Sequence, residues 1–386
     1  MDSIAEFAKE AKERPTSLRK AKKDGTKIVE YIANYVPEEL IYAAGAKPYL
    51  MCRGGEPEPP EAVLDDILRY MNPLYRSIGG FIKLGLDPVT PMTDLIAISQ
   101  HECHIQRFAE YLEFQDLPVH KVGVPTDWDR DFAQEYYYKE LLEFKQRLEE
   151  LTGNTISDDK LQHYLVLFKE MRSILRDIDA LRKKDSPPLG GKDFIHLNHN
   201  SFFTEPQFAI EKLKEIYNEL KDAPGKFAKD SPRILMVGHS VAVGDYIVVD
   251  KIEELGAVIV NEIMDEGMRC YQWDISAEGD PLRNIWRHRY LDKLPVDAFQ
   301  PAWRTRFDYM KKITEDYKVD GVIWYQLLYD EIYDLEYSCL AKWMAEIKMP
   351  LLRIETSYEY TREAMQPLTT RLESFISVLN SQKGGK

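Results

Sequence analysis

Strand-like and helix-like segments alternate near the start of the chain, and this alternation constrains the fold more than any other feature. An apolar run at 27–36 has the composition of a strand and leads directly to Pro37, which suits a helix N-terminus. Gly45 suits the end of that helix, and residues 46–51 return to a strand-like stretch. A strand–helix–strand unit is typical of parallel sheets, so the sequence predicts an α/β fold.

The C-terminal part of the chain repeats this alternation, with strand-like or helical runs at 233–240, 245–256, 257–264, 320–326 and 349–356. Between the two α/β parts, long helical patterns follow Asp131 and Ser157 and predict an antiparallel helical hairpin. The first residues predict a helical arm that Pro15 interrupts. We therefore predict three segments: the arm with an α/β domain (1–130), a helical linker region (131–228) and a second α/β domain (229–386).

The chain is acidic, and this narrows the classes of partner. It has 51 Lys and Arg against 65 Asp and Glu, a formal net charge of −14 at pH 7. Nucleic acids and anionic membranes both attract basic patches, so neither is expected as the main partner. No apolar run reaches the roughly 18 residues that a membrane helix needs, and the first residues lack the apolar region of a signal peptide. We expect a cytoplasmic protein.

The four cysteines, Cys52, Cys103, Cys270 and Cys339, are scattered and form no Cys-x-x-Cys pair. A self-contained zinc or iron–sulfur site usually shows closely spaced ligands. The residues His101, Cys103 and His104 are close together after a strand-like run and have side chains that suit a metal, but no second cluster completes such a site. The simpler interpretation is an ordinary loop end.

In α/β folds, active sites lie at the carboxyl ends of strands. The segments expected there are 99–103, 238–240, 264–269, 326–330 and 355–357. The turn at 237–245 has two glycines after a strand, like a phosphate-binding loop, yet it lacks both the dinucleotide and the P-loop spacing. A nucleotide-binding α/β protein therefore stays as an alternative from a different class.

Several segments resemble the family of 2-hydroxyacyl-CoA dehydratases and ATP-dependent benzoyl-CoA reductases. The opening signature is YVPEELIYAAGAKP at 35–48, and the later landmarks are 140–153 with 156–172, 281–291, 320–323, 352–355 and 370–375. The resemblance implies two Rossmann-like parallel-sheet domains with helical additions. It also implies a subunit that pairs with a homologous subunit around an iron–sulfur cluster near an acyl-CoA site. Separate activator-type subunits, which hydrolyse ATP and carry iron and sulfur, would supply electrons from ferredoxin.

The chain departs from the family at three cluster-ligand positions. Where family members carry cysteines in strand-end loops, this sequence has Asn72, Glu102 and Leu328. Cys103 lies one place after the second position, but a lone thiolate does not hold a cubane cluster. We therefore expect no metal bound by this chain, with Cys103 as a weak candidate ligand. The resemblance then implies that the partner subunit ligates most or all of the cluster.

Within the family, we favour a benzoyl-CoA reductase subunit, most similar to the C-type component of that enzyme, in an anaerobic heterotetramer with one cluster-bearing subunit and two activator-type subunits. Such an enzyme adds two electrons and two protons to benzoyl-CoA and forms cyclohexa-1,5-diene-1-carbonyl-CoA. His101 and Glu102 are the candidate proton donors at a strand end. The alternatives are the β subunit of a 2-hydroxyacyl-CoA dehydratase and a non-catalytic scaffold.

Overall fold

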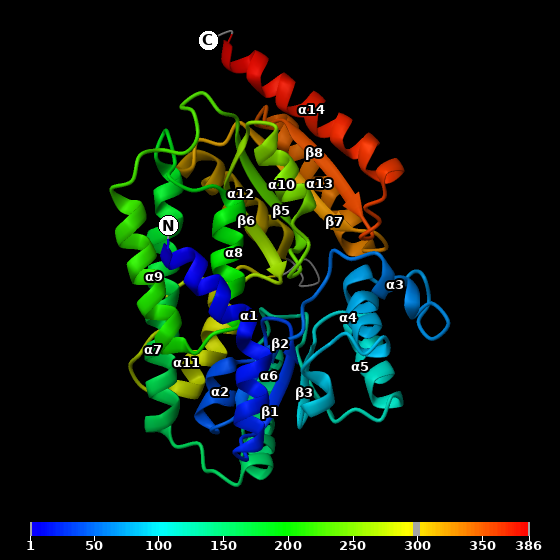
Figure 1. Cartoon of the computed structure of the whole chain (residues 1–386), viewed down its shortest axis with the longest axis vertical. Helices are drawn as coiled ribbons and strands as arrows, with labels where there is room; N and C mark the ends of the chain where they lie inside the picture. Colours follow the sequence, from blue (N-terminus) through cyan, green and yellow to red (C-terminus); the bar gives the residue numbers. More distant parts are fainter. Residues whose placement is uncertain (1, 296–301, 385–386) are drawn as a thin grey trace.

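The protein contains two four-stranded sheets, and every strand pairing in both sheets is parallel. The computed structural model describes residues 2–295 and 302–384. The first sheet has the order β2-β1-β3-β4 and the second the order β6-β5-β7-β8, so both are wound in the same way. Figure 1 shows the two sheets in separate halves of the molecule. The predicted α/β fold with two parallel-sheet domains is confirmed.

The strands are short and mostly apolar. Their bounds are β1 Ile28–Ile32, β2 Lys47–Leu50, β3 Leu95–Gln100, β4 Val119–Gly123, β5 Arg233–Ser240, β6 Val258–Glu266, β7 Gly321–Leu327 and β8 Leu351–Thr356. All residues of β1, β5 and β7 are buried. Continuous burial is the pattern of central parallel strands that helices cover on both faces.

In the first half, the helices are α1 Asp2–Lys23, α2 Glu38–Ala43, α3 Glu58–Ala62, α4 Pro73–Lys83, the 3-10 turn η1 Thr90–Met92, and α5 Cys103–Phe114. The predicted interruption at Pro15 is wrong, because α1 continues through it. Proline removes one backbone hydrogen bond from a helix. Here α1 is held along its length by packing on α8 and α9, and its buried Arg14 contacts Glu205 at 2.5 Å.

The middle of the chain is helical, as expected: α6 Asp131–Thr152, α7 Asp158–Ala180, η2 Leu181–Lys183, α8 Gly191–Phe202 and α9 Pro206–Lys221. Gly153 ends α6 in the left-handed conformation at φ +72°, and the Ser157 side chain accepts a hydrogen bond from the Lys160 N–H at the start of α7. After this turn the two helices serve different partners. The first, α6, packs on β4 and α11, whereas α7 packs mainly on α9, α2 and α11.

The second half adds α10 Ile247–Glu254, α11 Pro281–Arg287, the π-helical turn η3 His288–Asp292, α12 Ala302–Asp316, α13 Glu331–Glu346 and α14 Arg362–Gly384. The last helix lies along the outer edge of the second sheet beside β8 (Figure 1). Within the described residues, every helix is too short or too polar to span a bilayer.

The carboxyl ends of the two sheets meet. Arg53, just after β2, forms a parallel bridge with Val243, after β5. Asn34, after β1, donates a side-chain hydrogen bond to the carbonyl of Asp265 in β6. The contact brings the strand ends of both domains into one buried region, which is where a parallel α/β fold places its site.

Candidate functional site

Polar side chains from four strand ends and helix starts gather in this buried region between the sheets. His101 follows β3, and its Nε2 lies 3.5 Å from Oε1 of Glu266, at the end of β6. Asn72, at the start of α4, places Nδ2 3.4 Å from Oδ2 of Asp330, after β7. The predicted strand-end segments 99–103, 264–269 and 326–330 therefore come together.

His101 is a buried, neutral imidazole. Its side chain is 3% exposed, its Nδ1 lies 3.0 Å from Ser99 Oγ, and its ring contacts the ring of Tyr35. Burial lowers the pKa of His101 to about 3, and the nearby Lys293 acts in the same direction. When Nδ1 carries the ring proton and faces Ser99, Nε2 is left as an acceptor toward Glu266.

Glu266 is the proton-bearing partner of His101. Burial raises the pKa of Glu266 to about 8, the charges of Asp265 and Glu102 raise it further, and Lys293 opposes them. Near neutral pH the carboxyl group is therefore mainly protonated. Sequence reasoning did not single out Glu266, because it reads as the last residue of an ordinary strand. Together with His101, it forms a neutral acid–imidazole pair at the strand ends.

Glu102, in contrast, is committed to capping a helix. Its two carboxylate oxygens accept hydrogen bonds from the backbone N–H groups of His104 and Ile105, each at 2.6 Å. Asn72 caps α4 by accepting from the Leu74 N–H at 2.9 Å, and Asp330 caps α13. The N-terminus of α4 meets those of α5 and α13, since the Asn72 N–H also donates to Nδ1 of His104 at 2.8 Å. Two of the three expected cluster positions thus hold helix caps.

The third expected position, Leu328, contributes no polar side chain. Its backbone N–H donates to the carbonyl of Thr356, so Leu328 extends the pairing of β7 with β8. The polar group of this loop is Asp330, two residues later, which the sequence interpretation passed over. Burial raises the pKa of Asp330 to about 6, the charge of Asp265 acts in the same direction, and His104 opposes them.

The donor set of this site does not fit an iron–sulfur cluster. Such clusters need several thiolates, whereas the three positions offer an amide, a capping carboxylate and an aliphatic chain. Cys103 is the first residue of α5, and burial together with Glu102 raises the pKa of its thiol. No group of three or more His, Cys, Asp or Glu side chains is arranged for a metal ion within the described residues.

The two acids of the PEEL signature hold the domains together. Glu38 forms an ion pair with Arg269, and Glu39 contacts both Arg172 and Arg289 at 2.7 Å. These arginines come from α7, η3 and the loop after β6, far away in the sequence. Acids in a first helical turn suggest an interaction with the helix dipole. In this structure both acids are buried, and they bridge α2 to the linker and to the second domain.

The two glycines at 237–245 have structural reasons of their own. Gly238 lies within β5, and an added Cβ would sit 1.7 Å from the carbonyl oxygen of Tyr325 in β7. Gly244 adopts φ +105° and packs closely on the backbone of Gly54. Close strand pairing and contact between the domains therefore explain both positions without a phosphate group.

We expect a stability effect from the unusual protonation of Glu266. A carboxyl whose pKa is higher in the folded state binds more protons when folded, so its contribution is complete below about pH 4.5 and is lost as pH rises toward 8. Replacing Glu266 with Gln should remove this decline, at most about 1.4 kcal/mol per pH unit. Urea unfolding from pH 5 to 8.5 measures it, with the exposed Glu110→Gln as control. Parallel pH profiles for wild type and Glu266→Gln would show that Glu266 is already ionised.

The fold and site define a two-domain α/β protein with a buried polar site between the carboxyl ends of two parallel sheets. Residues 33–379 match the family model described as "2-hydroxyglutaryl-CoA dehydratase, D-component", and the chain belongs to this family. The resemblance found in the sequence is confirmed.

Named relatives match this chain along nearly its whole length. An Escherichia coli (strain K12) protein named "Putative dehydratase subunit YjiM" is 26% identical over 93% of both chains. The C-type component of benzoyl-CoA reductase from Thauera aromatica, also named as a subunit, is 24% identical over 90% of both chains. The β subunit of (R)-2-hydroxyglutaryl-CoA dehydratase from Acidaminococcus fermentans is 23% identical over 97% of this chain and 98% of its own. This chain is therefore similar to components of enzyme complexes.

Proposed function

We propose that this chain is the cluster-poor subunit of an ATP-dependent benzoyl-CoA reductase. The observation that carries the proposal is the site itself, where Asn72 and Glu102 use their side chains to cap helices at positions that the family resemblance assigns to cluster ligands. The cluster would belong to a homologous partner subunit, and this chain would shape the acyl-CoA site and hold protons for the reaction.

The neutral pair of His101 and Glu266 favours reduction over dehydration. Reduction of benzoyl-CoA to the cyclohexadiene consumes two electrons and two protons, whereas loss of water from a 2-hydroxyacyl-CoA leaves the proton count unchanged. A protonated Glu266 beside an accepting imidazole is suited to deliver a proton at neutral pH. Ferredoxin and the activator-type subunits would supply the electrons at the cost of ATP.

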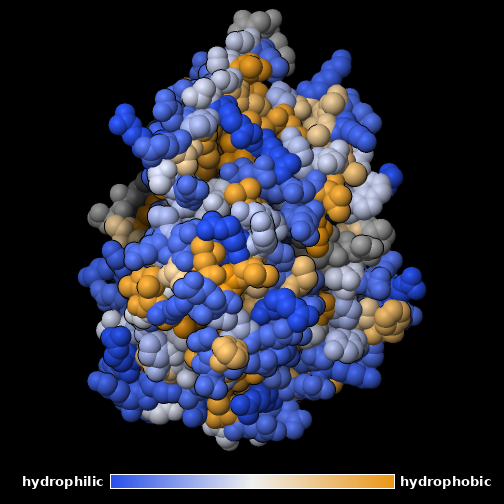
Figure 2. Space-filling view, turned by 90° about the vertical axis from the view of Figure 1, so that its right-hand side faces the viewer, coloured by the Kyte–Doolittle hydropathy of each residue, from blue (hydrophilic) through white to orange (hydrophobic). Residues whose placement is uncertain are grey.

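An exposed apolar groove beside the site supports docking of the partner subunit. It is lined by α5 and the segment before α4, and includes Leu68, Tyr70, Cys103, Tyr111 and Phe114. Leu68, Tyr70 and Phe114 are each at least 70% exposed. Figure 2 shows hydrophobic side chains gathered on the face that carries this half of the molecule. Exposed apolar patches of this kind mark interaction surfaces, and this groove lies next to Asn72 and Glu102.

The cofactor assignment is tested by iron and sulfide analysis under strictly anaerobic conditions. We expect the chain purified alone to contain iron far below four atoms per chain, and the complex with its homologous subunit to contain a full cluster. Changing Cys103 to Ser should leave the iron content of the complex unchanged. A stoichiometric four-iron cluster on the isolated chain would overturn the cluster-poor role.

The reaction is tested with the same complex plus the activator-type subunits, ATP and reduced ferredoxin. Formation of the cyclohexadienoyl thioester from benzoyl-CoA supports the proposal. The alternative is the β subunit of a 2-hydroxyacyl-CoA dehydratase, which the names of two relatives favour, from Clostridium sporogenes at 20% identity and Acidaminococcus fermentans at 23%. Loss of water from (R)-phenyllactyl-CoA or (R)-2-hydroxyglutaryl-CoA, without diene formation, would establish that alternative.

A further inference from the structure

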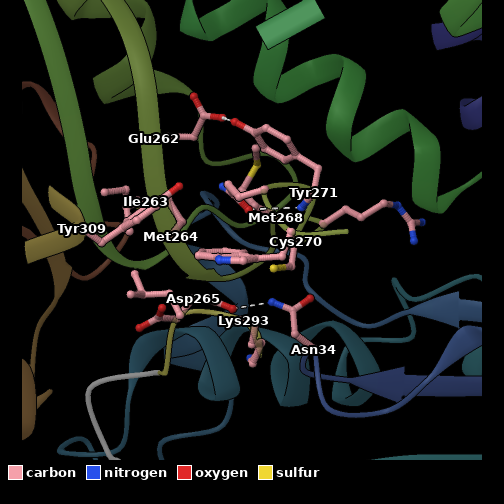
Figure 3. A pocket seen from close by; sticks show the side chains of 14 residues that line it. Asn34, Glu262, Ile263, Met264, Asp265, Met268, Cys270, Tyr271, Lys293 and Tyr309 are labelled. Carbon is pink, nitrogen blue, oxygen red and sulfur yellow. Dashed lines mark hydrogen bonds between the residues drawn. The ribbon is translucent and has the colours of Figure 1, made fainter. Parts of the chain in front are cut away.

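Four cationic side chains line one buried pocket next to the site. They are Arg172 from α7, Arg269 after β6, Arg289 from η3, and Lys293 just after η3. We call this pocket the arginine cavity. Its empty volume is about 360 Å³, and Tyr31, Asn34, Cys270 and His288 complete its wall. A second pocket shares Asn34, Arg269, Cys270 and Lys293 with it, and Figure 3 shows Cys270, Lys293 and Asn34 lining this second pocket.

The carboxylates beside the arginine cavity do not balance its cations. Glu38 pairs with Arg269, and Glu39 is shared between Arg172 and Arg289. The three arginines therefore face only two carboxylates. Burying an unbalanced charge is costly, so a bound anion would stabilise this arrangement.

Lys293 adds a fourth cation that has no carboxylate of its own. It is 6% exposed and makes no ion pair or hydrogen bond within the described residues, and its Nζ lies 3.7 Å from the centre of the Tyr35 ring. The acids nearest to it are Asp265, which Arg306 holds in an ion pair at 3.1 Å, and Glu266, which burial keeps mainly protonated near neutral pH. The excess of positive charge in the cavity therefore persists when these two acids are included.

Several donors that line the cavity lack a partner. Nε and Nη1 of Arg172, Nε of Arg289 and Nδ1 of His288 are buried and make no hydrogen bond. Arg172 is 3% exposed, and its Nη2 is held by Glu39, which fixes the guanidinium plane while leaving its other donors unused. Buried donors are nearly always satisfied in folded proteins. Their absence of partners at the wall of a positively charged pocket is a second, independent indication of a ligand.

We propose that the arginine cavity binds a small monocarboxylate anion. A planar carboxylate matches the fork of a guanidinium group, and the two neighbouring glutamates would repel an anion of higher charge. The pocket is narrow and enclosed, which excludes the nucleotide part of a CoA ester. The carboxylate would accept from Arg172 and Arg289 and would lie close to Lys293. This inference does not depend on the proposed reaction, because it concerns binding to the chain itself.

Formate is the probe, and the full chain alone is the sample. In chloride-free buffer, we expect formate to raise the unfolding midpoint in a saturable way, while fluoride at equal ionic strength does not. Acetate should behave like formate. Equal or stronger stabilisation by phosphate or by chloride would overturn the carboxylate assignment, and so would the absence of any saturable effect beyond that of fluoride.

Variants locate the binding site. Changing Arg172 to Lys keeps the charge but removes the fork, and we expect formate affinity, measured by calorimetry, to fall at least tenfold. Arg176 lies one turn further along α7, outside the cavity, where it pairs with Asp274. Changing Arg176 to Lys is the matched control and should leave formate affinity unchanged. If Arg172→Lys fails to fold, Lys293→Met provides the second test, and unchanged formate affinity in that variant would overturn the proposal.

Discussion

Replacing Arg182 with Met should destabilise the fold by about 3–5 kcal/mol, because it leaves two buried carboxylates without a cation. The Arg182 side chain is fully buried in η2, where its Nη1 lies 2.6 Å from Oε2 of Glu262 and its Nη2 contacts Asp179. The guanidinium also stacks over the ring of Phe194 at 4.0 Å. The midpoint of urea unfolding at pH 7.5 measures the loss.

Two controls separate the charge effect from lost packing. Changing Asp179 to Asn and Glu262 to Gln in the Arg182→Met background removes the stranded charges and should recover most of the stability. Arg147, whose contact with Glu150 is 3.9 Å long and exposed, is the surface comparison, and Arg147→Met should cost less than about 1 kcal/mol.

The loss in Arg182→Met should also shrink as pH falls from 7.5 toward 5. Without the arginine, the two carboxylates become neutral by taking up protons, and burial already raises the pKa of Glu262 in the wild type. A loss below about 1 kcal/mol at pH 7.5 would show that Asp179 and Glu262 do not depend on Arg182.

The parallel sheets were predictable because their strands carry a strong local signal. Residues 233–240 and 320–326 are continuous apolar runs, and such runs are what a strand covered on both faces requires. The edge strand β4 was not predicted, because Val119–Gly123 is half polar and only Val122 is buried. Helix α8 was missed for a related reason. Gly190, Gly191 and the asparagines suggested a loop, whereas burial of Phe194, Ile195 and Leu197 stabilises a helix there.

The candidate site was only partly predictable from the sequence. The order of strands and helices indicated the strand-end loops, and the structure does bring His101, Asn72 and the loop after Leu328 together. Glu266 and Lys293 were not found, because their unusual environment arises from burial between two domains rather than from any local motif. The same holds for Arg172 and Glu39, which are 133 positions apart and meet only in the folded chain.

Replacing His101 with Gln should reduce turnover of the assembled reductase by about 10²–10⁴-fold, the usual contribution of a positioned acid or base. Gln has a similar size and retains a hydrogen-bonding group near Ser99, but it cannot pass a proton between Glu266 and the site. His163 is exposed on α7 and far from the strand ends in the fold, so His163→Gln is the matched control. Diene formation under substrate saturation measures the effect.

The pH profile distinguishes this proton-transfer role from a purely structural one. Wild-type turnover should fall as pH rises past about 8, where Glu266 loses its proton, and the residual activity of His101→Gln should no longer follow that ionisation. Glu102→Gln should have little effect on turnover, because both oxygens of Glu102 face backbone N–H groups. If Glu102→Gln instead lost a hundredfold in turnover while His101→Gln stayed within twofold of wild type, the proton donor would be Glu102, and Glu266 with His101 would serve only to pack the two domains together.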